Sequence, residues 1–288
     1  MKLFTKFFCF AVSGSLLISN GSKAQVSFIN ANSKLTSTDI HSGCPATVVD
    51  VNGDGLDDIV RLDQAHLLYI DYQRPGLQFD HHYIGNFGGD AGWAWAMCVA
   101  DVDHNGYKDV LAGGYGPAVK IFKLNSTGTS GTLYSLDTSF FFLQNANFAD
   151  INNDGWEDIF ACDDDAESHI WLNNGNGNFT VSHIIDFDVT NTDDSGNYGS
   201  VWTDFDNDGD VDLYIAKCRQ GVASPSDGRR IDVLFENDGN NNYTSNAAEY
   251  GLADSAETWT CNFADIDNDG DLDAIQTDYD VPAKLLEN

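Results

Sequence analysis

Basic residues are scarce in this chain. Its 288 residues include 14 lysines and arginines against 45 aspartates and glutamates, which gives a formal net charge of −31. Proteins that bind nucleic acid rely on basic surface, so this balance argues against a nucleic-acid partner. Long apolar runs are also scarce beyond the N-terminus, and we expect no membrane span.

Signatures of catalysis and of thiolate metal binding are lacking as well. The chain has no CxxC pair, no GxSxG motif and no phosphate-binding glycine loop. The carboxylates that cluster are accounted for by the loops described below, so no spare pair marks a glycosidase. Beyond the N-terminal segment five cysteines remain, and most lie in or beside expected strands, where buried free thiols are the plain interpretation. These are Cys44, Cys98, Cys162, Cys218 and Cys261.

Residues 1–24 have the pattern of a secretory signal peptide. Two lysines flank the start of an apolar run at 7–18, and the small residues Ser22 and Ala24 precede Gln25. The run is too short for a comfortable membrane span. We therefore expect a protein that is secreted or held at the cell surface, and removal of the segment's three lysines would take its charge to −34.

One nine-residue acidic pattern recurs five times. Every copy has Asp or Asn at positions 1, 3 and 5, Gly at position 6 and Asp at position 9, and the starts are 51, 49, 54 and 61 residues apart. Calcium binds six to eight oxygens, which such a loop can supply from side chains 1, 3, 5 and 9 and the main-chain carbonyl at 7. The copies, named loops 1 to 5, are residues 50–58, 101–109, 150–158, 204–212 and 265–273.

The spacing predicts up to five Ca²⁺ ions, one in each loop. Solvated Asp/Gly turns are the alternative, but plain turns do not require an acid at the ninth position. Without cations, the repulsion among the clustered carboxylates would strain the loops. The predicted ligands are Asp50, Asn52, Asp54, Leu56 and Asp58; Asp101, Asp103, Asn105, Tyr107 and Asp109; Asp150, Asn152, Asp154, Trp156 and Asp158; Asp204, Asp206, Asp208, Asp210 and Asp212; and Asp265, Asp267, Asp269, Asp271 and Asp273.

The flanking sequences distinguish these loops from EF-hands. An EF-hand needs a bidentate Glu at position 12 and a helix on each side. Position 12 here holds Arg, Ala, Ala, Ile and Gln, and the flanks are short β-rich runs such as "ATVVD" before loop 1 and "DIVRL" after it. Each loop is therefore expected at the tip of a β-hairpin whose strands are buried on both faces.

The hairpins belong to a larger repeat. Another apolar strand follows each of them, as in "LLYI" at 67 and "HIWL" at 169, and two copies continue through Asn/Gly turns into an aromatic strand. About four strands in roughly fifty residues is the size of a propeller blade. The fold class is therefore predicted to be all-β, a β-propeller of four-stranded blades with five repeats visible.

The repeat resembles the FG-GAP/VCBS repeat of integrin-α-type propellers. The stretch "NFGGDAGWAWAMCVADVDHNGYKDVLAGG" at 86–114 is the best example, and "DFDNDGDVDLYIAKC" at 204–218 also resembles secreted cartilage-acidic-protein/UnbV-like proteins. The resemblance covers nearly all of residues 26–288 and implies a propeller over 25–288 with calcium in the hairpin loops. It implies no single activity, since such propellers serve adhesion, recognition and, less often, polysaccharide cleavage.

The number of blades is open. The family usually has about seven blades, and only five loops are visible. The chain is expected to be a fragment of a larger ring, which is the interpretation we favour. Alternatively, the segment "QVSFINANS" at 25–33 supplies the missing outer strand of the last blade.

Four further features are candidate sites. Trp93 and Trp95 could line a sugar-binding surface, although packing between blades is the preferred interpretation. The insertion 217–230 carries three arginines, Arg219, Arg229 and Arg230, which either suit a carboxylate ligand or are solvated. Adjacent strand residues point to opposite faces, so His81 and His82 are not expected to share a metal. The run "DDDAE" at 163–167 is interpreted as solvated surface.

Two functional hypotheses from different classes follow. The first is a secreted, calcium-binding, non-enzymatic propeller that recognises or adheres to an extracellular protein or glycan. The second is a polysaccharide-active enzyme, such as a calcium-assisted lyase in which a Lys, Tyr or His abstracts a proton. A purely structural component of the cell envelope is a third possibility.

Overall fold

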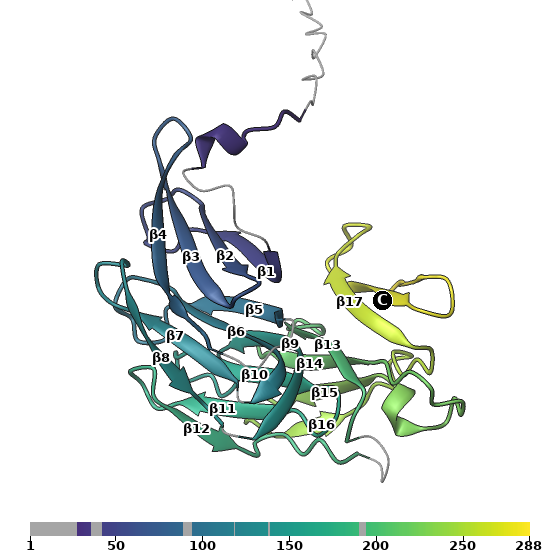
Figure 1. Ribbon diagram of the computed structural model, residues 1–288. Coiled ribbons are helices and arrows are strands. Elements are labelled where there is room, and N and C mark those ends of the chain that lie inside the picture. Colours follow the sequence, from purple (N-terminus) through teal and green to yellow (C-terminus); the bar gives the residue numbers. More distant parts are fainter. Residues whose placement is uncertain (1–27, 36–41, 89–93, 118, 138, 190–193) are drawn as a thin grey trace, which may run out of the picture.

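The computed structural model describes residues 28–35, 42–88, 94–117, 119–137, 139–189 and 194–288 (Figure 1). Apart from two short 3₁₀ turns, Asn32–Lys34 and Gly228–Arg230, every regular element in this part of the chain is a β-strand. No helix among these residues is long and apolar enough to cross a membrane. The predicted signal peptide, 1–24, lies outside the described residues and stays a prediction.

The strands form five antiparallel blades in chain order. Blade 1 comprises β1 (Ser42–Val49), β2 (Asp58–Asp63), β3 (Leu67–Arg74) and β4 (Gln78–Asn86). Blade 2 comprises β5 (Ala94–Ala100), β6 (Asp109–Pro117), β7 (Lys120–Leu124) and β8 (Gly131–Ser135). Blade 3 comprises β9 (Phe140–Ala149), β10 (Asp158–Asp163), β11 (His169–Asn173) and β12 (Phe179–Ser182). Blade 4 comprises β13 (Asn197–Thr203), β14 (Asp212–Lys217), β15 (Val233–Asn237) and β16 (Tyr243–Ser245), and blade 5 comprises β17 (Thr258–Ala264), β18 (Asp273–Asp278) and β19 (Lys284–Leu286).

The blades fan out along an arc, which confirms the predicted β-propeller architecture (Figure 1). The first strands of successive blades, β1, β5, β9, β13 and β17, are neighbours along the inside of the arc. Blades 2 and 3 are also joined by backbone hydrogen bonds, because the end of β6, the second strand of blade 2, pairs with the start of β9 from Tyr115↔Phe142 to Pro117↔Phe140. Four blades have the four strands that the repeat predicted.

The strand predicted from the N-terminal segment is not formed. Residues 28–35 contain a 3₁₀ turn and no strand, and β19 pairs with β18 alone among the described residues. The alternative that 25–33 completes blade 5 is therefore wrong for the part of that segment which the structure describes. Pro-free Asn/Ser-rich sequence favours local side-chain bonds of this kind, and Asn30 Oδ1 accepts the Asn32 N–H at 2.9 Å.

The core consists of layers between blades. The residue directly after each loop and its partner on the third strand form the front row of a blade, and the next residue and its partner form the rear row. The rear row of each blade packs against the front row of the blade that follows it. The rear rows are Val60/Ile70, Leu111/Ile121, Phe160/Ile170, Tyr214/Leu234 and Ile275/Leu285, and the front rows are Ile59/Asp71, Val110/Phe122, Ile159/Trp171, Leu213/Phe235 and Ala274/Leu286.

The two terminal blades depart from this rule in opposite ways. The rear rows of blades 1 to 4 are fully buried, whereas Ile275 and Leu285 of blade 5 are 39% and 61% exposed. On the front of blade 1 the aromatic or aliphatic partner is replaced by Asp71, which is buried and forms an ion pair with Arg61 and a hydrogen bond with His81. The front of blade 1 is thus adapted to a polar environment, and the rear of blade 5 is not.

Leucines in a buried and in an exposed rear row should therefore respond differently to truncation. Leu111→Ala is expected to lower the free energy of unfolding by about 2–5 kcal/mol, because it opens a cavity between blades 2 and 3. Leu285→Ala should change it by no more than about 0.5 kcal/mol, because that side chain is largely exposed. Urea denaturation of both variants measures the difference. Equal losses would show that the rear face of blade 5 is covered in solution.

Candidate metal-binding loops

Each acidic loop is the tip of a β-hairpin, as predicted. Loops 1 to 5 join β1 to β2, β5 to β6, β9 to β10, β13 to β14 and β17 to β18, and every pair is antiparallel up to the loop. All five loops follow the first strand of a blade, so they lie at the same end of their blades. The repeat therefore places its acidic groups along one face of the arc.

Two left-handed residues shape every loop. The residue at position 4 has φ between +55° and +71°, and the glycine at position 6 has φ between +83° and +103°. Glycine is needed at position 6 because other residues are strained there. Its N–H donates to the aspartate at position 1 in all five loops, at 2.8 to 3.2 Å. Position 4 holds Gly53, His104, Asn153, Asn207 and Asn268.

The fifth position is fixed by a further local bond. Its side-chain oxygen accepts the N–H of position 7 in every loop, at 2.9 to 3.1 Å. Such Asx-type bonds hold the loop backbone in a compact turn. The N–H of position 7, the residue whose carbonyl the sequence predicts as a ligand, is therefore held by the side chain at position 5.

The ninth aspartate has a role that the sequence analysis missed. One of its oxygens accepts the N–H of position 2, at 2.9 to 3.3 Å. The other accepts an N–H at the end of the third strand, at 2.7 to 3.0 Å. The carboxylate therefore pins loop, second strand and third strand together. The five residues, Asp58, Asp109, Asp158, Asp212 and Asp273, are all buried.

Burial perturbs the protonation of these carboxyls. It raises the pKa of Asp109 and Asp212 to about 7 and that of Asp158 to about 6, against the opposing effect of the backbone N–H donors. The pKa of Asp273 is lowered instead, because the N–H groups of Asn288 and Ile266 stabilise its charge. The charged form of the ninth aspartate is thus poorly solvated in blades 2, 3 and 4, where burial raises its pKa.

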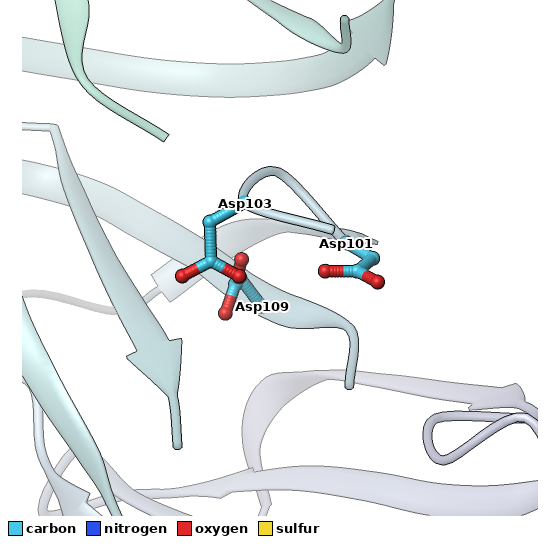
Figure 2. Close-up of side chains that lie close together, drawn as sticks. All are labelled: Asp101, Asp103 and Asp109. Carbon is cyan, nitrogen blue, oxygen red and sulfur yellow. The ribbon is translucent and has the colours of Figure 1, made fainter. Parts of the chain in front are cut away.

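Three loops bring acidic ligand atoms together. One oxygen from each member of the group lies within 4.8 Å of the others in loops 2, 4 and 5, and Figure 2 shows the group of loop 2. Two buried oxygens, Oδ1 of Asp103 and Oδ1 of Asp204, have no hydrogen-bond partner among the described residues. A buried carboxylate oxygen without a donor fits a hard cation. The groups are Asp101, Asp103 and Asp109; Asp204, Asp206 and Asp212; and Asp265, Asp267 and Asp269.

Loops 1 and 3 are arranged differently. They carry an asparagine at position 3, whose Nδ2 donates to the aspartate at position 5: Asn52 to Asp54 at 3.2 Å, and Asn152 to Asp154 at 3.0 Å. Within the described residues, acidic side chains converge in threes in loops 2, 4 and 5 only. The side-chain amide at position 3 therefore offsets part of the repulsion among the carboxylates of loops 1 and 3. Loops 2, 4 and 5 have an aspartate at this position and no such amide.

The loops also lie on the seams between blades. The carbonyl of position 2 accepts a bond from the next blade in loops 1, 2 and 3: from Lys108 N, Asn173 Nδ2 and Tyr243 Oη, each at 2.8 Å. His104 of loop 2 stacks on Trp156 of loop 3 with ring centroids 4.0 Å apart. Ordering a loop would therefore also order its junction with the neighbouring blade.

The arginines of the 217–230 insertion are not available as the basic group that the sequence suggested. Arg219 pairs with Asp164 and Asp165, Arg229 pairs with Asp227, and Arg230 pairs with Asp280. Each arginine has a carboxylate of this chain within 3.2 Å. The three arginines are therefore neither free to bind a carboxylate ligand nor simply solvated. The pairs neutralise the loop locally.

Other candidates also have different surroundings from those expected. Asp163 and Asp164 are 3% and 8% exposed, so the interpretation of 163–167 as solvated surface is wrong for these two, and Asp163 instead accepts the N–H of Phe142. His81 and His82 do point to opposite faces, toward Asp71 and Tyr72 respectively. Trp95 is partly exposed and packs on Phe142, while Trp93 lies outside the described residues.

The cysteines in the described side chains carry no disulfide. Cys98, Cys162, Cys218 and Cys261 are free, and three of them are buried, as the sequence suggested. Burial raises the pKa of Cys162 and Cys261 to about 12 and that of Cys218 to about 11, so these thiols are inert at neutral pH.

Five antiparallel blades that repeat one acidic hairpin define a β-propeller with a loop-bearing face. The chain belongs to the FG-GAP-like repeat family, whose model matches residues 50–112, 101–161 and 150–215. Each match runs from one acidic loop through the next, so the loop and the blade are recognised together. A comparison with curated proteins gave no match.

Solved structures with similar folds include a lectin from Agrocybe aegerita. That protein is 21% identical, with a TM-score of 0.56, and the similarity covers 85% of this chain and 66% of the lectin. The Bap1 biofilm matrix protein of V. cholerae is 18% identical over 82% of this chain and 35% of that one, with a TM-score of 0.44. This chain thus spans less than two thirds of the length of either protein.

Two positions of loop 5 should separate the backbone-pinning role from cation binding. Asp273→Asn leaves one of two partly buried N–H groups without an acceptor, so the metal-free protein should lose about 1 kcal/mol of unfolding free energy. Asp267→Asn should leave it within about 0.5 kcal/mol, because asparagine already occupies this position in loops 1 and 3. Denaturation without metal measures both. Equal destabilisation by the two substitutions would contradict the assigned role of the ninth aspartate.

The metal-free protein should become less stable as pH rises. Folded Asp109 and Asp212 retain protons up to about pH 7, whereas the unfolded chain releases them near pH 4. The free energy of unfolding therefore falls through that interval, because the folded state binds more protons than the unfolded state. Thermal melts at pH 5, 6, 7 and 8 in metal-free buffer test this. A melting temperature that rises steadily with pH would refute it.

Proposed function

We propose that this protein binds calcium in its hairpin loops and serves as an extracytoplasmic recognition module for a protein or glycan ligand. The observation that carries the calcium assignment is the pair of buried, donorless oxygens on Asp103 and Asp204, each inside a group of converging carboxylates. Water or a donor would normally satisfy such atoms. A cation satisfies them and also offsets the repulsion within each group.

Calcium fits the donors better than softer metals do. The loops offer carboxylate, amide and carbonyl oxygens, and no thiol or imidazole belongs to the three acidic groups. Hard divalent cations select such oxygen sets, and Ca²⁺ tolerates the flexible geometry of a loop. The carbonyls of Asp210 and Asp271 complete the predicted sets of loops 4 and 5. Magnesium is less suited, because it demands near-octahedral geometry and retains water.

The bound ions would act on structure and not on chemistry. Each loop closes one blade and, in loops 1 to 3, accepts a bond from the next blade. Binding free energy gained by the folded state alone adds to stability. Calcium would therefore stiffen the seams of the arc and hold the surfaces between blades in a fixed shape.

Recognition is supported by the fold and by the predicted export. The A. aegerita lectin is described as specifically recognising non-reducing terminal N-acetylglucosamine, and it shares the fold at a TM-score of 0.56. That similarity of fold supports a glycan ligand as the first to test here. The predicted signal peptide supports a location outside the cytoplasm, and the −31 net charge of the chain argues against a nucleic-acid partner.

Calcium titration tests the proposal. Addition of Ca²⁺ to metal-free protein should raise its melting temperature, and the increment should grow from pH 5 to pH 8 because the ligands must be deprotonated. Calorimetry should show uptake that Asp103→Asn and Asp204→Asn reduce. Absence of uptake, or a melting temperature that chelator leaves unchanged at pH 8, would refute the calcium assignment.

A further inference from the structure

A polar cleft of about 260 Å³ lies between blades 1 and 2, beside loops 1 and 2. Its blade 1 wall consists of Tyr72 and Arg74 at the end of β3, Asp80 and His82 on β4, and Asn52 of loop 1. The family repeat does not account for these side chains, because the equivalent seams between blades 2 and 3 and between blades 3 and 4 are occupied by the His104–Trp156 stack and by Tyr243.

The blade 2 wall is held at a fixed distance from the blade 1 wall. It consists of Tyr107 in loop 2 and two threonines, Thr127 and Thr129, in the turn between β7 and β8. Tyr72 Oη donates to the carbonyl of Gly128 in that turn at 2.7 Å. A Cβ on Gly128, which has φ +66°, would lie 2.4 Å from the Tyr107 ring, so the turn passes between the two tyrosines and requires glycine.

The cleft offers both donors and acceptors without a net charge of its own. Arg74 Nε donates to Asp80 Oδ2 at 2.8 Å, and both side chains are about half exposed, at 51% and 52%. The Oγ1 atoms of Thr127 and Thr129 lie 2.9 Å apart and are exposed. Polar groups of both kinds therefore face a ligand from the two walls.

Aromatic surface completes the lining. His82 packs edge-on against Tyr72, with ring centroids 5.5 Å apart at 68°, so its imidazole is held on the wall. Tyr107 is partly exposed on the other side. Small-ligand sites typically combine such rings with a few placed polar groups.

We infer that this cleft binds a neutral saccharide unit, a conclusion that rests on the recognition function proposed above. Sugar hydroxyls both donate and accept, which matches the Arg74–Asp80 pair and the threonine hydroxyls, and the C–H face of a sugar ring suits the tyrosine and imidazole surfaces. An anionic ligand is disfavoured, because the one guanidinium of the cleft is already paired and the carboxylates of loop 1 lie beside it. Charge complementarity thus selects an uncharged occupant.

The cleft is coupled to the acidic loops. Asn52 is position 3 of loop 1, Tyr107 is position 7 of loop 2, and Lys108 N donates to Val51 O at 2.8 Å between these loops. A cation that orders either loop therefore also orders a wall of the cleft. Saccharide affinity should consequently fall when calcium is removed, and by linkage the saccharide should strengthen calcium binding by the same factor.

Binding can be measured with the full chain in 1 mM calcium chloride, taken as roughly a saturating level for an extracellular module. The probes are neutral gluco-, manno-, galacto- and N-acetylglucosamine oligosaccharides, with alginate and hyaluronan as acidic polymers. At least one neutral oligosaccharide should bind. Binding to acidic polymers alone, or to none of the probes, would overturn the inference.

Variants locate the site. His82→Ala, and the charge-balanced pair Arg74→Gln with Asp80→Asn, should each weaken neutral-saccharide affinity by about tenfold or more. The matched control is Tyr83→Ala, next along β4 on its opposite, exposed face, which should change affinity less than about twofold. Melting temperatures in calcium confirm that each variant folds.

The outcomes separate this inference from the proposed function. Saccharide binding that both cleft variants leave intact would overturn the cleft assignment while upholding glycan recognition elsewhere. Failure of calcium uptake by the same preparation would instead contradict the proposed calcium site. Loss of binding in the cleft variants alone, with calcium uptake retained, would establish both.

Discussion

The structure depends on a buried aspartate at the start of the second strand of every blade. This carboxylate accepts one N–H from its own loop and one from the third strand, whereas an amide side chain would offer only one acceptor oxygen. Burial makes the charge unfavourable, which is visible in the raised pKa of Asp109 and Asp212. The two N–H bonds to this carboxylate therefore fix the hairpin geometry of the blade. They do so at the cost of a buried negative charge, which a nearby cation would offset.

Stability is distributed along the chain as in other repeat proteins. Each blade contacts its neighbours through one apolar layer, so the described blades form a linear array of nearest-neighbour contacts. On the front of blade 1, the buried Asp71 forms an ion pair with Arg61 and a hydrogen bond with His81. The seam between blades 4 and 5 adds a polar network, in which Tyr214 and Gln276 donate to Asp232, whose pKa burial raises to about 7. That network fixes the position of blade 5 against blade 4, where the apolar contact between the two blades is small.

Much of this architecture is predictable from the sequence. The spacing of loops 1 to 5 predicts five repeats and the positions of their hairpins, because the pattern of acids and glycine requires one backbone conformation. The pairing of Arg219 and Arg230 with carboxylates is not predictable, since their partners lie 50 to 55 residues away in the chain. The second role of the ninth aspartate was hidden for the same reason: its donor, such as Leu124 N, lies on another strand. The local nine-residue pattern therefore specifies the turn conformation. The hydrogen-bond partners of each aspartate depend on tertiary contacts with other strands.

The difference between the loops follows from one amide. Where position 3 is asparagine, as in loops 1 and 3, its Nδ2 donates a hydrogen bond to the aspartate at position 5. The negative charge of that aspartate is then partly offset within the loop itself. Where it is aspartate, as in loops 2, 4 and 5, three carboxylates converge and two oxygens remain without donors. Affinity for a cation rises with ligand charge, so loops 4 and 5, with four carboxylates among their side-chain positions, should fill before loops 1 and 3. Filling would then proceed from the exposed end of the arc, where the apolar seam is smallest and the added rigidity has most effect.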